Sequence, residues 1–209
     1  MQDAAITMVL GIGNVLWADD GFGVRAVEAL HERFSAPDGV LIVDGGTQGL
    51  NLLDCVCDSR RVVVFDAIDF SLPPGTLKVL RDAEIPAWVP AKVSLHQASF
   101  QEVLALARLR DRTPERMTLI GVQPTTLADF GGSLSPAVRD RLDEALAVAV
   151  NELAAWGAPC VPRTAPPPER LNDHSLAIQA YESGRPGSED ACRIGDARFL
   201  AQRLSIEAR

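Results

Sequence analysis

Acidic residues follow three predicted strands of this sequence, and a histidine follows later. Asp19 and Asp20 lie in the loop after the first strand, Asp44 ends the second, and Asp66 ends the third. His96 lies in a loop after the fourth strand. Open α/β sheets bind their ligands beyond the carboxyl ends of the strands. If the first and third strands are neighbours, Asp20, Asp66 and His96 meet at one edge, where they could bind a metal ion.

The side-chain types narrow the choice of metal. Carboxylates gathered at one edge repel each other, and a cation relieves that repulsion. Arg25 and Lys92 could supply the charge, but a divalent metal fits better. Two carboxylates and one imidazole suit nickel, zinc or iron more than magnesium. The alternative for any single aspartate is that it caps the helix that follows.

The pattern of apolar residues predicts the elements that would position these side chains. Short apolar runs predict buried strands at 6–10, 40–43, 62–65, 76–80 and 117–122. Helical spacing predicts helices at 21–34, 50–56, 98–109 and 135–156, the last with Ser135 as N-cap and Pro136 after it. Only residues 67–75 separate the third and fourth strands, which is too short for a parallel crossover. We therefore expect a three-layer α/β fold with a mixed, mostly parallel twisted sheet and helices on both faces.

A change in composition divides the chain near residue 157. Residues 1–157 are expected to form the α/β domain, and residues 158–209 a proline-rich C-terminal extension that is disordered or holds short helices at 171–181 and 191–206. The extension contains seven basic and seven acidic residues, so the formal net charge of −8 lies in the α/β domain.

The acidic charge limits the partners of this protein. It argues against binding to nucleic acid or to an anionic membrane surface. No apolar run reaches the roughly 18 residues of a membrane span, and the first residues lack the basic start of a secretion signal. We therefore expect a cytoplasmic protein. The cysteines Cys55, Cys57, Cys160 and Cys192 have no metal or redox spacing and are expected to be free thiols.

A dinucleotide site is the second interpretation of the first loop. Gly11 and Gly13 follow a strand and precede a helix, as in a dinucleotide-binding motif. The third glycine of that motif is replaced by Leu16, however, and Asp19 and Asp20 stand where a pyrophosphate would approach. Negative charge at that position opposes phosphate binding.

With these residues located, the sequence resembles the [NiFe]-hydrogenase maturation endopeptidases. The resemblance rests on five stretches in family order, spread over the expected α/β domain. They are GIGNVL with DDGFGV (11–16, 19–24), DGGTQG (44–49), DA (66–67), SLHQ (94–97) and GVQP (121–124). Each stretch alone is weak evidence, but their order and spacing together are specific.

The resemblance implies a function and a set of site residues. Members of this family remove a short C-terminal extension from the hydrogenase large-subunit precursor after nickel insertion. By motif position, the metal contacts fall on Asp20, Asp66 and His96. The first acid is often Glu, and the shorter Asp20 leaves the coordination open. Asp44 supports the site or does acid–base work, so Asp20, Asp44 and Asp66 are the expected catalytic residues.

The nickel is expected to come with the substrate. The protein would then be an aspartate-dependent protease that senses whether its substrate has been loaded with metal. Because a binding protein would share every motif, a non-cleaving chaperone for the large subunit stays open as an alternative. A nucleotide-dependent enzyme is the other alternative.

Overall fold

The computed structural model describes residues 6–87 and 95–185, with the side-chain environments of 86–87 and 95–99 left aside. A five-stranded sheet forms its centre, in the order β3-β1-β4-β6-β5. Its strands are β1 (Thr7–Ile12), β3 (Val40–Gly46), β4 (Arg61–Ala67), β5 (Leu77–Arg81) and β6 (Arg116–Val122). All neighbours pair in parallel except β5, which runs antiparallel to β6. The mixed sheet and the antiparallel fourth strand are therefore as predicted.

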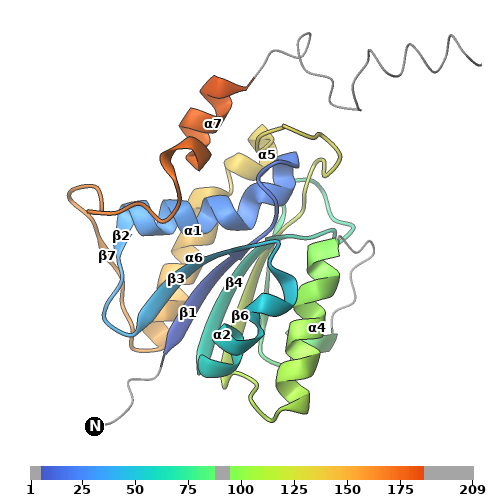
Figure 1. Ribbon diagram of the computed structural model, residues 1–209, viewed down its shortest axis with the longest axis vertical. Coiled ribbons are helices and arrows are strands. Elements are labelled where there is room, and N and C mark those ends of the chain that lie inside the picture. Colours follow the sequence, from blue (N-terminus) through green and yellow to red (C-terminus); the bar gives the residue numbers. More distant parts are fainter. Residues whose placement is uncertain (1–5, 88–94, 186–209) are drawn as a thin grey trace, which may run out of the picture.

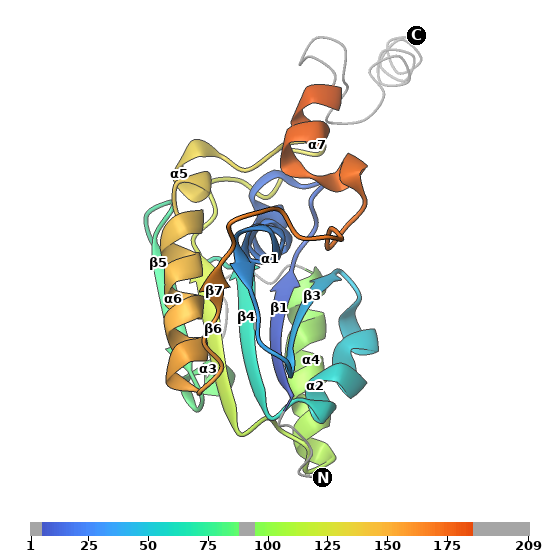
Figure 2. The same cartoon turned by 90° about the vertical axis from the view of Figure 1, so that its left-hand side faces the viewer.

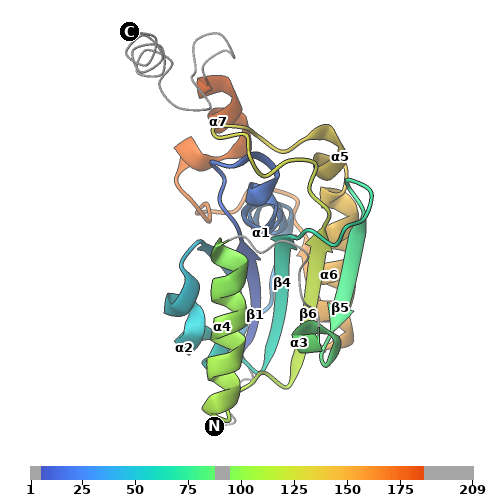
Figure 3. The same cartoon turned by 90° about the vertical axis from the view of Figure 1, so that its right-hand side faces the viewer.

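Helices cover both faces of the sheet (Figure 1). On one face lie α1 (Phe22–Arg33) and α6 (Leu142–Ala155), and on the other lie α2 (Leu53–Asp58) and α4 (Leu95–Leu109). Side chains alternate along a strand. In β4, Val63 and Phe65 therefore pack towards α1 and α6, whereas Val62 and Val64 pack towards α2 and α4. Figure 3 shows α2 and α4 in front of the sheet. These layers confirm the predicted three-layer fold.

Two glycines let α1 approach the sheet closely. A Cβ atom on Gly11 of β1 would overlap the carbonyl oxygen of Gly23 in α1. A Cβ atom on Gly23 would in turn overlap the carbonyl oxygens of Ile12 and Phe65, at the ends of β1 and β4. Only glycine fits at these contacts. The start of α1, and the loop before it, are thereby held against the carboxyl ends of the two central strands.

The C-terminal extension returns over α1. Its strand β7 (Val161–Pro162) pairs with β2 (Phe34–Ser35), and η3 (His174–Leu176) and α7 (Ile178–Gly184) follow. Figure 2 shows this segment crossing the outer side of α1, with α7 at the carboxyl end of the sheet. We call residues 163–185 the C-terminal arm. The expected helix at 191–206 lies outside the described residues, and the domain boundary near 157 stays a prediction.

The remaining elements are short. They are η1 (Ala18–Gly21), η2 (Gly49–Leu52), α3 (Glu84–Ala87) and α5 (Pro136–Arg139). The predicted helix at 135–156 is interrupted at residues 140–141, so α5 and α6 are separate. In the described parts of the chain, no helix combines the length and the apolar character that crossing a bilayer requires.

Candidate metal centre

The structure places Asp20 and Asp66 on contacting elements at the carboxyl edge of the sheet. Asp20 lies in η1, which contacts β4, and Asp66 is the penultimate residue of β4. Their exposed fractions are only 5% and 4%. Since β1 and β4 are neighbours, the predicted convergence of the first and third strand ends is confirmed. Two buried carboxylates on contacting elements are the core of the candidate site.

The first loop folds back, so that Asp20 lies close to the end of β1. Gly13 has φ of +133°, and a Cβ atom there would overlap the carbonyl oxygen of Asp20. Ala18, the first residue of η1, has a left-handed φ of +49°. The backbone N–H of Asn14 donates to Asp20 Oδ2 at 3.0 Å. The loop is therefore closed upon the carboxylate of Asp20.

Asp19 has a different role from Asp20. It is fully buried, and its Oδ2 accepts from the backbone N–H groups of Thr125 and Thr126 at 2.8 and 3.1 Å. Ser135 donates its backbone N–H to Oδ1 at 2.6 Å and its hydroxyl to Oδ2 at 3.0 Å. Both oxygens of Asp19 thus tie the first loop to residues 125–135. Asp19 is therefore a structural residue, and Asp20 stays the predicted site residue of the pair.

Gln123 of the GVQP stretch holds the loop that follows Asp66. Its side-chain oxygen accepts from the backbone N–H groups of Phe70 and Leu72 at 2.7 and 3.2 Å. Its amide donates to Asp69 Oδ1 at 3.1 Å. Because Gln123 is 7% exposed, these bonds are shielded from water. Gln123 is a support for the site and was not among the predicted site residues.

His96 lies at the same edge as the two aspartates. It is the second residue of α4, which leads into β6, a parallel neighbour of β4. Because α4 runs opposite to the strands, it begins at their carboxyl ends (Figure 3). The predicted loop position is therefore the first turn of a helix. The side chain of His96 and the whole of Lys92 lie outside the described residues.

Asp44 lies on β3, the strand next to β1, and is half-buried. The backbone N–H of Gly13 donates to the carbonyl oxygen of Gly46 at 3.0 Å, which links the DGG stretch to the first loop. A cavity of about 150 Å³ lies between them, and Asn14 and Asp44 are both in its wall. Asp44 Oδ2 accepts a 2.8 Å hydrogen bond from Asn172 of the C-terminal arm. The arm thus takes part in the edge of the site, which the sequence had not indicated.

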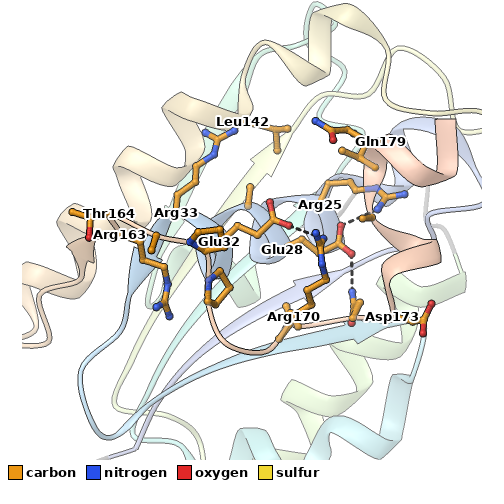
Figure 4. A pocket seen from close by; sticks show the side chains of 18 residues that line it. Arg25, Glu28, Glu32, Arg33, Leu142, Arg163, Thr164, Arg170, Asp173 and Gln179 are labelled. Atoms are coloured by element: carbon orange, nitrogen blue, oxygen red, sulfur yellow. Dashed lines mark hydrogen bonds and ion pairs between the residues drawn. The ribbon is translucent and has the colours of Figure 1, made fainter. Parts of the chain in front are cut away.

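A cavity of about 680 Å³ lies elsewhere, between α1 and the C-terminal arm (Figure 4). Four arginines line it, and each has a partner. Arg25 pairs with Glu28, Arg33 with Asp143, Arg170 with Glu32, and Arg163 bonds two backbone carbonyls. Arg25 also donates to the carbonyl oxygen of Leu176 and lies 5.5 Å from the Tyr181 ring centroid. Arg25 was the other candidate to neutralise the site carboxylates, but within the described residues its bonds go to Glu28 and to the arm.

The donor chemistry of the edge suits a metal ion. Asp20 and Asp66 supply carboxylate oxygens, and His96 would add an imidazole, a set that borderline transition metals accept. Among the side chains that the structure describes, no three His, Cys, Asp or Glu residues form a metal-binding group, and His96 is not one of those side chains. The described part of the site is therefore a pair of carboxylates.

The same loop is poorly suited to a nucleotide. The backbone N–H groups of a glycine-rich loop must be available to a bound pyrophosphate. Here the N–H of Asn14 donates to Asp20, that of Leu16 to Asn14 Oδ1, and that of Trp17 to Asn14 O. This loop already has internal acceptors, which agrees with the unfavourable charge noted in the sequence.

Comparison with known proteins identifies the family. The model of the HycI family, described as hydrogenase maturation protease, matches residues 24–152. This chain belongs to that family. HupD of Rhodobacter capsulatus, a hydrogenase expression/formation protein, is 52% identical over 202 residues, covering 96% of each chain. The hydrogenase 2 maturation protease of Escherichia coli is 40% identical over 159 residues, which are 76% of this chain and 96% of that protein.

Solved structures of this protease family share the fold. The hydrogenase maturating endopeptidase HybD of E. coli matches with a TM-score of 0.72 and 38% identity, over 76% of this chain and 98% of HybD. The maturation protease thus has the mixed α/β sheet of its relatives. About a quarter of the chain has no counterpart in HybD, whereas HupD matches nearly the full length.

Proposed function

We propose that this protease removes the C-terminal extension of a [NiFe]-hydrogenase large-subunit precursor and recognises the nickel that the precursor carries. The observation that supports this most is the pair of buried carboxylates, Asp20 and Asp66, on contacting elements at the carboxyl edge of the sheet. Family membership supports hydrogenase processing, and the donor set supports nickel.

The nickel is part of the substrate in this proposal. Asp20, Asp66 and His96 would contact it from one side, while the precursor holds the other. A cation bound between two carboxylates is attracted by both, so the site favours the loaded precursor over the empty one. Gripping the nickel aligns the nearby peptide bond, and proximity lowers the barrier.

The hydrolysis itself needs a base and a polarised carbonyl. We propose that nickel polarises the scissile carbonyl and that a carboxylate, with Asp44 as the candidate, takes the proton from the attacking water. The proton then passes to the leaving amine as the C–N bond breaks. Asp44 is suited to this by its place beside the first loop and its contact with the 150 Å³ cavity.

The test compares nickel-loaded and nickel-free precursor. Each is incubated with the protease, and intact-mass spectrometry follows the loss of the C-terminal extension. We expect cleavage of the loaded form only. Equal cleavage of both forms would contradict nickel recognition, and full activity of His96→Ala would contradict the assignment of His96.

A non-cleaving chaperone is the second candidate, and the same experiment separates it from the protease. It predicts a stable complex with the precursor and no change in precursor mass. The protease relatives favour cleavage.

A reducing compartment such as the cytoplasm fits the proposed function, because Cys55, Cys57 and Cys160 are free thiols.

A further inference from the structure

The C-terminal arm covers the polar face of α1. Arg25 and Glu28 face the arm and are only 4% and 13% exposed. His31 Nε2 is 2.9 Å from the carbonyl oxygen of Glu169 in the arm. These polar groups are one face of a helix whose opposite face packs on the sheet. The arm therefore has a specific, polar contact surface beside the candidate site.

Asn172 makes the contact that reaches the site. Its Nδ2 donates to Asp44 Oδ2 at 2.8 Å and to Glu28 Oε1 at 2.9 Å. An amide nitrogen has two hydrogens, and ionised carboxylates only accept. Both hydrogens of Asn172 are therefore used, and its amide bridges the carboxylates of Asp44 and Glu28. Of the described residues, Asn172 is the one that hydrogen-bonds the Asp44 carboxylate.

A second arm residue closes the cavity beside Asp44. Leu176 lines the 150 Å³ cavity together with Asn172, opposite Gly13, Asn14 and Val15 of the first loop. At the far end of the arm, α7 is fixed to the loop after β6. Glu182 accepts from Ser133 at 2.5 Å and from Arg139. The arm thus spans the site edge from Asp44 to the loop that Asp19 ties to η1.

The relatives divide according to this part of the chain. The family model ends at residue 152, before the arm, and about a quarter of the chain is unmatched in the E. coli hydrogenase 2 protease. HupD of R. capsulatus matches 96% of this chain, and HoxM of Azotobacter vinelandii matches 93% of it. A site part supplied by the arm would therefore distinguish this protein from the shorter proteases.

We infer that Asn172 is a positioning residue for Asp44, so that the C-terminal arm forms one wall of this protein's site. The inference rests on the proposed function, because it gives Asp44 a part in hydrolysis. Asn172 itself does not act on the peptide bond. It fixes the direction of a carboxylate that does.

The test is the kinetics of precursor cleavage by Asn172→Ala. Losing a hydrogen bond to a charged group is expected to lower kcat about tenfold, with KM changed less than about twofold. Asn172→Gln keeps the amide, and the adjoining cavity leaves room for its extra methylene, so it should recover most of the loss. Arg170→Ala is the matched control, because it removes an arm contact to Glu32 of α1 without touching Asp44.

A second readout does not depend on cleavage. Hydrogen exchange of residues 44–49 should be faster in Asn172→Ala than in the unaltered protein, and unchanged in Arg170→Ala. Wild-type activity of Asn172→Ala, or equal loss of kcat in both variants, would overturn the inference. If the unaltered protein does not cleave the precursor, the proposed function fails, and hydrogen exchange alone decides the role of Asn172. Unchanged exchange in Asn172→Ala then overturns it.

Discussion

Replacing Asp19 by Asn should destabilise the protein, whereas replacing its neighbour Asp20 by Asn should spare stability and abolish cleavage. Asp19 is fully buried and accepts four hydrogen bonds, at 2.8, 3.1, 2.6 and 3.0 Å. Three of the donors are backbone N–H groups of the 125–135 segment. An asparagine places an NH₂ group where one carboxylate oxygen of Asp19 was, so some of the four donors lose their acceptor.

The magnitude follows from the number of donors affected. A buried donor without an acceptor costs about 1–3 kcal/mol, and charged acceptors make the stronger bonds. With one oxygen lost and Thr125 itself exposed to water, we expect a loss of roughly 2–4 kcal/mol in the free energy of unfolding. For a chain of this length, that corresponds to a fall of about 5–15 °C in Tm.

The assay is urea unfolding of Asp19→Asn and Asp20→Asn, followed by circular dichroism, with precursor cleavage measured on the same preparations. Asp20→Asn should unfold within about 1 kcal/mol of the unaltered protein, because asparagine keeps a side-chain oxygen that can accept the N–H of Asn14. A stable Asp19→Asn, or an active Asp20→Asn, would refute the division of roles between the two residues.

Three further predictions concern the fold and the arm. Gly23→Ala should cost about 3 kcal/mol in unfolding experiments, because its Cβ overlaps two carbonyl oxygens, whereas Gly184→Ala, which meets no atom, should cost less than about 1 kcal/mol. Burial raises the pKa of Glu182, but hydrogen bonds from Ser133 and Arg139 outweigh it and the pKa lies below the ordinary 4.5. The stabilisation that ionised Glu182 gives is thus present above pH 4.5 and is lost as the pH falls through its lower pKa in the folded protein. Hydrogen exchange of α7 should therefore be faster in acid, and this acceleration should be smaller in Glu182→Gln. Burial raises the pKa of Cys160, so peptide mass spectrometry should find it alkylated far more slowly than exposed Cys55; equal rates would contradict its burial.

Local patterns were sufficient for the fold. Four of the five strands contain an apolar run, and the short connection 67–75 correctly indicated an antiparallel β5. The sequence was less informative where a partner lies far along the chain. Asp19 and Asp20 look alike in sequence, but the partners of Asp19 are 106 to 116 residues away. Ser135 occupies the predicted N-cap, yet its hydroxyl bonds Asp19 and not the helix.

The C-terminal arm shows the same limit. Its prolines predicted disorder or short helices, and its specific contacts are with the polar face of α1. The arm partners of Arg25 and Glu28, which are Leu176 and Asn172, follow 151 and 144 residues later in the chain. No periodic pattern links such distant positions. The role of Asn172 could only be inferred from three-dimensional structure.

The central claim is that Asp20, Asp66 and His96 form one nickel-binding cluster. The most direct test is the anomalous scattering of crystals soaked in millimolar nickel, measured at the nickel absorption edge, since even a weak site is occupied at that concentration. We predict one peak with bonds of about 2.0–2.2 Å to both carboxylates and the imidazole. A peak elsewhere and none at the carboxyl ends of β1 and β4, or a peak there without His96, would contradict the cluster.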